Sequence, residues 1–182
     1  GYTFDPAPEL QKERVAIIGG GPAGLSAAYQ LRKMGYASTI FEERKELGGM
    51  MRYGIPGYRT PRDLLDKEIE RIINLGDIEL VLGKRVGKDV KLDDVEKSHD
   101  AVLWTIGCWN GKAIPVDGGD ATNCITGVDF LEAFCDGRLK VGSKKVICVG
   151  GGDTSIDVVS VARRLGHISK TVSYTHLRAH ET

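Results

Sequence analysis

Residues 14–31, RVAIIGGGPAGLSAAYQL, contain the pattern that decides the fold of this 182-residue chain. The β-branched, apolar run at residues 14–18 is typical of a buried parallel strand. A glycine-rich turn at residues 19–24 follows and leads directly into a helix. A second apolar run, ASTIFE at residues 37–42, comes next. The order strand, glycine-rich turn, helix, strand predicts a compact βαβ unit.

The turn matches G-x-G-x-x-G, with Gly19, Gly21 and Gly24 at the three fixed positions and Pro22 and Ala23 between them. The first glycine allows a tight turn, the second lets the backbone approach a pyrophosphate, and the third allows close packing of helix and strand. The N-terminus of the following helix offers unpaired N–H groups to phosphates. The turn therefore predicts a dinucleotide site, against the alternative of a glycine-rich turn without a ligand.

Two acidic residues close the second predicted strand. Glu42 lies 18 residues beyond Gly24 (42 − 24), near the roughly 20 expected of an acid that binds a ribose 2′-hydroxyl. Its neighbour Glu43 is included in the predicted site. An acid at this place argues against a 2′-phosphate in this site.

A second opening of the same kind, KKVICVGGGDTSIDVVSVARRLG, occupies residues 144–166. Gly150 and Gly152 hold the first two fixed positions, and the small Ser155 stands at the third. Asp153 and Thr154 complete the predicted loop. A carboxylate beside phosphates is unfavourable unless it points away, so Asp153 either weakens binding or caps the helix. Two such openings predict an α/β chain with two Rossmann-like dinucleotide-binding units, the second incomplete.

The rest of the chain up to the second loop predicts further helices and strands. The segment TPRDLLDKEIERIINLG, residues 60–76, predicts a helix that Thr60 caps, with Pro61 first in the helix. Its expected apolar face consists of Leu64, Leu65, Ile69, Ile72 and Ile73. We expect strands at IELVLG (78–83) and DAVLWTIG (100–107), and helices at KLDDVEKS (91–98) and GVDFLEAFCDG (127–137).

Composition excludes several classes of function. The chain has 25 Lys plus Arg and 25 Asp plus Glu, so zero net charge gives no reason to expect nucleic acid or an anionic membrane as partner. No apolar run approaches the roughly 20 residues of a membrane span, and no signal peptide is recognised, so we expect a cytoplasmic protein. The four cysteines are widely spaced without a C-x-x-C pair, which argues against a metal site.

The ends of the chain stand apart from the two units. Residues 1–13 have no clear period and predict a linker. Residues 14–115 are expected to form one nucleotide-binding domain, and residues 116–171 a connection and the start of another. The last eleven residues, VSYTHLRAHET, match one reading frame of a transposase sequencing adapter, so residues 172–182 are left out of functional reasoning.

Four stretches together resemble the small subunit of glutamate synthase and its relatives, which include the flavin-containing half of dihydropyrimidine dehydrogenase. They are residues 15–31, residues 48–72 (GGMMRYGIPGYRTPRDLLDKEIERI), residues 100–107 and residues 150–166. The sequence YGIP, followed by R-x-P and a charged amphipathic helix, is more specific than either glycine-rich turn. The resemblance covers roughly residues 14 to 170.

The resemblance implies an FAD domain interrupted by an NAD(P)H-binding domain, behind a cysteine-rich domain that holds iron–sulfur clusters upstream of Gly1. NADPH or NADH would reduce the flavin, and the electrons would leave through the clusters to an acceptor subunit such as a glutamate synthase large subunit. No cysteine pair is then needed after Gly48 and Gly49. The residue that selects NAD or NADP would fall within 172–182, so the choice stays open.

Site residues follow position by position from the same resemblance. Gly19, Gly21, Gly24 and Glu42 match the FAD fingerprint, and Gly48, Gly49 and Met50 match the segment near the flavin. Thr105 and Gly107 match an alanine–threonine–glycine-like turn. Gly150, Gly152, Asp153 and Thr154 match the NAD(P)H loop. Hydride transfer needs no side-chain acid or base, so no catalytic residue and no metal ligand are named. By itself this stretch is expected to be inactive. A reductase of another pathway and a non-catalytic nucleotide-binding module are the alternatives.

Overall fold

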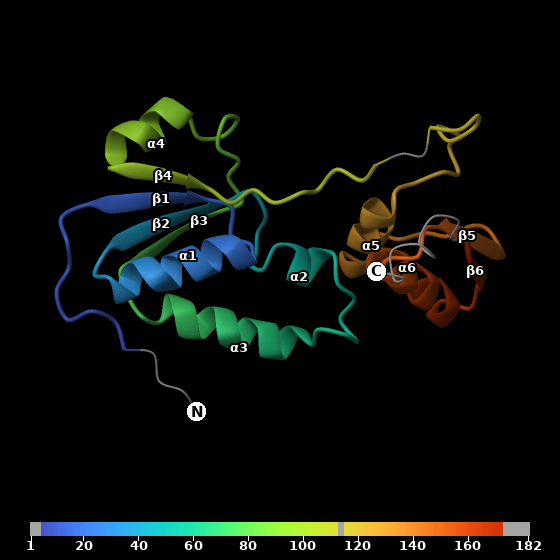
Figure 1. Ribbon diagram of the computed structural model, residues 1–182, viewed down its shortest axis with the longest axis horizontal. Coiled ribbons are helices and arrows are strands. Elements are labelled where there is room, and N and C mark those ends of the chain that lie inside the picture. Colours follow the sequence, from blue (N-terminus) through green and yellow to red (C-terminus); the bar gives the residue numbers. More distant parts are fainter. Residues whose placement is uncertain (1–4, 113–114, 173–182) are drawn as a thin grey trace, which may run out of the picture. The chain divides into compact units, whose positions relative to one another are not determined.

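The computed structural model describes residues 5–112 and 115–172 (Figure 1). It divides into two compact units. Unit 1 consists of Gly1–Arg52 and Thr60–Cys108, and unit 2 of Tyr53–Arg59 and Trp109–Thr182. The short segment Tyr53–Arg59 therefore belongs to unit 2 although both of its flanks belong to unit 1.

Unit 1 contains a four-stranded parallel sheet in the order β3-β2-β1-β4. Its strands are β1 Arg14–Ile18, β2 Ala37–Glu42, β3 Ile78–Leu82 and β4 Ala101–Trp104. Ile17 of β1 lies opposite Ile40 of β2 and Leu103 of β4 in the register. The parallel sheet confirms the predicted α/β class.

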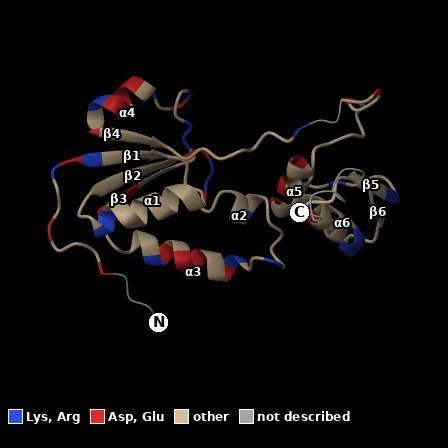
Figure 2. Ribbon diagram, in the orientation of Figure 1, with Lys and Arg blue, Asp and Glu red and all other residues tan. Residues whose placement is uncertain are grey.

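Helices cover both faces of this sheet, with α1 Pro22–Lys33 and α3 Arg62–Ile73 on one face and α4 Leu92–Ser98 on the other (Figure 1). The short helix α2 Met50–Tyr53 follows the glycine pair and covers neither face. Successive side chains of a strand point to opposite faces. Ile17 accordingly packs in a core with α1 and α3, whereas Ala16 and Ile18 pack with Val95 of α4. In unit 1, helices α3 and α4 carry many of the charged residues (Figure 2). This is expected because helices cover both faces of the sheet, so the outer surfaces of the helices face the solvent.

The start of α3 differs from the prediction. Its first helical residue is Arg62, and Pro61 is the N-cap in an extended conformation (φ −55°, ψ 131°) without a side-chain cap hydrogen bond. Thr60 therefore lies before the cap and cannot cap the helix, because proline also disfavours the helical conformation of the residue before it. Leu64, expected on the apolar face, is 55% exposed, whereas Leu65 and Ile69 are buried.

The described part of unit 2 contains two parallel strands and two helices, which are α5 Gly127–Cys135, β5 Lys145–Val149, α6 Asp153–Arg164 and β6 Ile168–Val172. Its core forms where α5 meets α6, with Phe130 and Leu131 packed against Val158, Val161 and Ala162. The strand–turn–helix order confirms the second predicted opening. Apart from Val172, the adapter-like stretch lies outside the described residues.

Among the helices of the described ranges, none is both long and apolar enough to cross a membrane.

Replacement of Ile17 tests the core of unit 1. Ile17 is completely buried between β1 and the helices α1 and α3. We expect Ile17→Ala to lower the free energy of unfolding by about 2–5 kcal/mol, measured by urea denaturation with circular dichroism. Leu64→Ala, at an exposed position of α3, is the matched control and should change it by well under about 1 kcal/mol. Equal losses in the two variants would contradict the assigned core.

Candidate nucleotide-binding sites

The first glycine-rich turn lies between the ends of three neighbouring strands of unit 1. The Gly19 amide donates a hydrogen bond to the Phe41 carbonyl of β2 (2.8 Å). The Thr105 hydroxyl, just beyond β4, donates to the carbonyls of Ile18 (3.0 Å) and Gly19 (2.8 Å). The predicted site residues Gly19 and Thr105 are therefore in direct contact. Gly107, two residues further on, has φ +71°, a conformation that favours glycine.

Gly24 and Gly21 have different surroundings, in line with their different roles in the motif, which are helix–strand packing for Gly24 and approach to a pyrophosphate for Gly21. A Cβ at Gly24 would collide with the carbonyl oxygen of Gly19, so only glycine lets α1 approach β1 this closely. A Cβ at Gly21 would meet only the Cα of Gly49, at 3.6 Å, an ordinary contact. Gly21 is the N-cap residue of α1, and a Cβ there would meet no closer heavy atom than this one. A glycine at the N-terminus of a helix is the kind of position that lets a pyrophosphate approach the backbone.

Glu42 holds the turn from the end of β2. Its carboxylate is buried and accepts hydrogen bonds from the Gly20 amide (2.7 Å) and the Arg44 amide (2.9 Å). Glu43, in contrast, forms an ion pair with Arg85 (3.5 Å) at a partly exposed position. The structure therefore brings Glu42 to the glycine turn and directs the Glu43 carboxylate to a separate partner.

The Gly48–Gly49 segment lies against the first turn. The Gly48 amide donates to the Gly20 carbonyl (2.8 Å), and a Cβ at Gly49 would stand 2.7 Å from the Cα of Gly21. Both residues have positive φ values, +121° and +50°, which explains the glycine pair. Met50 begins α2 directly after them. Two segments that are distant in sequence therefore pack backbone to backbone at the N-terminus of α1.

Arg52 fixes this segment, and the sequence analysis did not single it out. Its buried guanidinium donates to the Leu47 carbonyl (2.6 Å) through Nε and to the Asp66 carboxylate of α3 through Nη2. Arg62 donates in turn to the carbonyls of Arg52 and Met51. Arg52 thus ties the glycine pair to α3. Nothing in the sequence distinguished it from the exposed arginines, since only tertiary contact reveals its burial.

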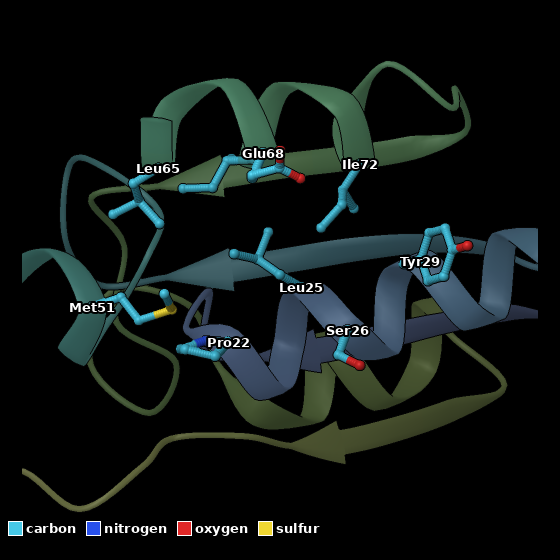
Figure 3. Close-up of a pocket in the computed structure, with 9 residues that line it drawn as sticks. Pro22, Leu25, Ser26, Tyr29, Met51, Leu65, Glu68 and Ile72 are labelled. Atoms are coloured by element: carbon cyan, nitrogen blue, oxygen red, sulfur yellow. The ribbon is translucent and has the colours of Figure 1, made fainter. Parts of the chain in front are cut away.

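A groove of about 280 Å³ lies beside α1 and α3 (Figure 3). Pro22 and Met51 border one end, and Tyr29 lines it further along α1. The lining is mainly aliphatic, and its one charged side chain is Glu68. An acidic, mostly apolar groove does not suit a pyrophosphate, so we place the dinucleotide at the glycine turns.

The second glycine-rich turn opens α6. Gly150 has φ +133°, and Gly152 is the N-cap, where a Cβ would have no heavy atom within 4 Å. This open position fits a phosphate in the same way as Gly21. Asp153 is the first residue of the helix and is exposed, and no side chain forms a cap hydrogen bond. The interpretation of Asp153 as a cap is therefore wrong, because the extended cap position belongs to Gly152.

Thr154 lies where the starts of α5 and α6 meet. A Cβ at Gly127, the first residue of α5, would stand 3.0 Å from the Thr154 methyl group. The predicted residues of the second loop, Gly150, Gly152, Asp153 and Thr154, all lie at the start of α6.

No metal centre accompanies these turns within the described ranges, where no group of three or more His, Cys, Asp or Glu side chains could hold an ion. All four cysteines, Cys108, Cys124, Cys135 and Cys148, are free thiols. This part of the chain therefore holds no disulfide to accept electrons.

Two glycine substitutions separate ligand binding from folding. Gly21→Ala places a methyl group at an ordinary contact distance from the Cα of Gly49, so we expect the free energy of unfolding to change by less than about 1 kcal/mol. The same methyl group obstructs a pyrophosphate, so flavin affinity, measured by quenching of flavin fluorescence, should fall about tenfold or more. Gly24→Ala should instead cost about 2 kcal/mol or more of stability. Unchanged flavin affinity in Gly21→Ala would argue against this site.

Arg52→Ala tests the support of the glycine pair. Loss of the guanidinium removes the partner of the Leu47 carbonyl and of Asp66, so we expect the Gly48–Gly49 segment to loosen and flavin affinity to fall about tenfold. The matched control is Arg71→Ala on α3, whose exposed pair with Glu68 should contribute little. Equal flavin affinities of the two variants in the same titration would exclude a role for Arg52.

Comparisons with known proteins agree with this geometry. The sequence pattern of the family described as pyridine nucleotide-disulphide oxidoreductase matches residues 13–180. The chain is 41% identical to the NADPH-Fe(3+) oxidoreductase subunit beta of Geobacter sulfurreducens over 180 residues, which cover 96% of this chain and 26% of that protein. It is 32% identical to the glutamate synthase [NADPH] small chain of Azospirillum brasilense over 172 residues, 88% of this chain and 36% of that one.

The solved structure of Mycobacterium tuberculosis FprA in complex with NADPH has the same fold, with a TM-score of 0.75 over 83% of this chain and 36% of that chain, at 20% identity. The chain thus spans 26–36% of the length of these three proteins. The matches confirm the resemblance to the glutamate synthase small chain. With the family pattern matched along nearly its whole length and both glycine turns at strand–helix junctions, this chain belongs to the pyridine nucleotide-disulphide oxidoreductase family.

Proposed function

We propose that this chain is part of an FAD-dependent oxidoreductase that takes electrons from NADPH or NADH and delivers them through iron–sulfur clusters to an acceptor subunit. The observation that carries the proposal is the glycine-rich backbone at the N-terminus of α1, where Gly21 is the N-cap residue and the Gly48–Gly49 segment packs directly against it. Family membership supports a redox role, and the two strand–turn–helix openings supply one site for each nucleotide.

Unit 1 provides the groups that FAD needs. The amides at the N-terminus of α1 face the pyrophosphate, and the absence of a side chain at Gly21 lets it approach the backbone. The Glu42 carboxylate stands at the end of β2, where a ribose hydroxyl can donate to it beside its two amide partners. The Gly48–Gly49 segment packs against the same turn and forms the wall along the flavin.

Unit 2 provides the site for the reduced nicotinamide nucleotide. Its pyrophosphate binds at Gly152 and the N-terminus of α6. Bound flavin supplies the redox chemistry, since it accepts a hydride and can release electrons one at a time. The contribution of this chain is to bind and orient the two nucleotides, and no side chain has to move a proton.

The positions of the cysteines support the proposed route by which electrons leave the flavin. Flavoproteins that reduce disulfides use a cysteine pair near the flavin, whereas the segment after Gly49 begins with Met50 and contains no cysteine before Cys108. All four thiols of the chain are free. An exit through iron–sulfur clusters in a domain that precedes this chain removes the need for a pair. Its partner would then be an acceptor subunit such as a glutamate synthase large subunit.

Anaerobic reduction of the full-length protein tests this function. We expect bound flavin, bleaching of its visible absorbance on addition of NADPH or NADH, and subsequent reduction of clusters seen by electron paramagnetic resonance. Gly21→Ala, as the matched variant, should lose the flavin and with it the bleaching. Bound flavin that neither nucleotide reduces would favour a non-catalytic nucleotide-binding module. Flavin reduction without any cluster signal would refute the proposed exit.

A further inference from the structure

Segment Tyr53–Arg59 contributes a charged contact to the second nucleotide turn. Nη1 of Arg59 donates to both carboxylate oxygens of Asp157, each at 2.8 Å, across 98 residues of sequence. Asp157 belongs to α6 and is 5% exposed, whereas the Arg59 side chain is 48% exposed. A buried carboxylate requires a partner, and here the partner comes from the YGIPGYR stretch.

The start of α6 carries two negative charges. Asp153 and Asp157 are four residues apart, so they lie on the same face of the helix in its first two turns. The positive end of the helix dipole attracts an anion to Gly152, but carboxylates so close to it oppose a pyrophosphate. The sequence therefore places a repulsive element beside a loop that is built for phosphates.

The guanidinium of Arg59 interacts with both carboxylates. Its pKa is raised above the ordinary value first by the hydrogen bond to Asp157, then by the charge of Asp157, and also by the charge of Asp153. Arg59 therefore stands where it offsets the two acids together.

The position of Arg59 is fixed by contacts along both helices of unit 2. The neighbouring Tyr58 ring stacks under the guanidinium of Arg164, 4.0 Å from the ring centroid, at the far end of α6. The Cys135 thiol of α5 lies 3.5 Å from the Ile55 carbonyl. The segment thus follows α6 from Asp157 to Arg164, which explains its place in unit 2.

We propose that Arg59 is the charge-compensating residue of the second dinucleotide site: it neutralises Asp157 and offsets Asp153, so that the N-terminus of α6 attracts the pyrophosphate of NADPH or NADH. This inference rests on the proposed function and adds to it a residue from outside the glycine loop. Arg59 acts through the two acids and is a positioning residue, not a catalytic one.

The sign of the effect distinguishes charge compensation from a structural ion pair. The variants are Arg59→Gln, Arg59→Lys, Asp157→Asn and the double variant Arg59→Gln/Asp157→Asn, made in the full-length protein. Dissociation constants for NADPH and, separately, NADH are read anaerobically from nicotinamide fluorescence, with the flavin and clusters reduced beforehand by dithionite so that no hydride transfer consumes the nucleotide. We expect Arg59→Gln to weaken binding about tenfold, less at high salt, because two nearby acids are left uncompensated.

The other three variants should bind the nucleotide about as tightly as the unaltered protein or more tightly. Arg59→Lys keeps the charge and should stay within about threefold of the unaltered protein. Asp157→Asn removes one repulsive charge, so binding should be as tight or tighter, and the double variant should return to within about threefold. The double variant leaves no buried charge at position 157, so it decides the question even if Arg59→Gln folds poorly. Arg138→Gln, which breaks the exposed pairs with Asp136 and Glu132, is the matched control.

Two results would overturn the inference while leaving the proposed function intact. One is unchanged nucleotide binding in Arg59→Gln with an unchanged melting temperature. The other is a loss in Asp157→Asn as large as that in Arg59→Gln without recovery in the double variant, which would mean that the ion pair only supports the fold. If the unaltered flavoprotein binds neither NADPH nor NADH, the proposed function fails and this inference fails with it.

Discussion

The close approach of helix α1 to strand β1 is the constraint on which the first site depends. It is possible because Gly24 has no side chain, since a Cβ there would collide with the Gly19 carbonyl. The approach brings the N-terminus of α1 to the end of the sheet, next to Thr105. The backbone of Gly20 in this turn then donates a hydrogen bond to the Glu42 carboxylate and accepts one from the Gly48 amide. Each of these contacts uses backbone groups that a bulkier turn would hide or displace.

A partly buried ion pair lies near each glycine-rich turn. In unit 1, Arg52 connects the Leu47 carbonyl beside the glycine pair to Asp66 of α3. In unit 2, Arg59 pairs with the buried Asp157 behind the second turn. Arg59 belongs to the stretch of YGIP, R-x-P and charged helix that the resemblance had marked as more specific than either glycine-rich turn, and Arg52 directly precedes it. The structure supplies a physical reason for that specificity, since each arginine must reach a carboxylate distant in sequence.

The absence of a redox-active cysteine pair distinguishes this chain from disulfide reductases of its family. Met50 and Met51 follow the glycine pair, and the first cysteine, Cys108, comes only after the turn that contains Thr105. A flavin bound here would need another acceptor. The proposal of external iron–sulfur clusters meets that need without asking any side chain of this chain to change its oxidation state.

The sequence by itself determined the parallel strands, the two strand–turn–helix openings and the glycines at their fixed positions, because these depend on local periodicity and on conformations that only glycine adopts easily. It also identified Glu42, since the acid lies at a fixed distance from the turn. Only the tertiary structure decided that α3 begins at Arg62 without a side-chain cap, that Leu64 is exposed, and that Arg52 and Arg59 pair with carboxylates elsewhere in the chain. An arginine has the same local pattern whether it is solvated or paired, and burial against a distant carboxylate is a property of the folded chain alone.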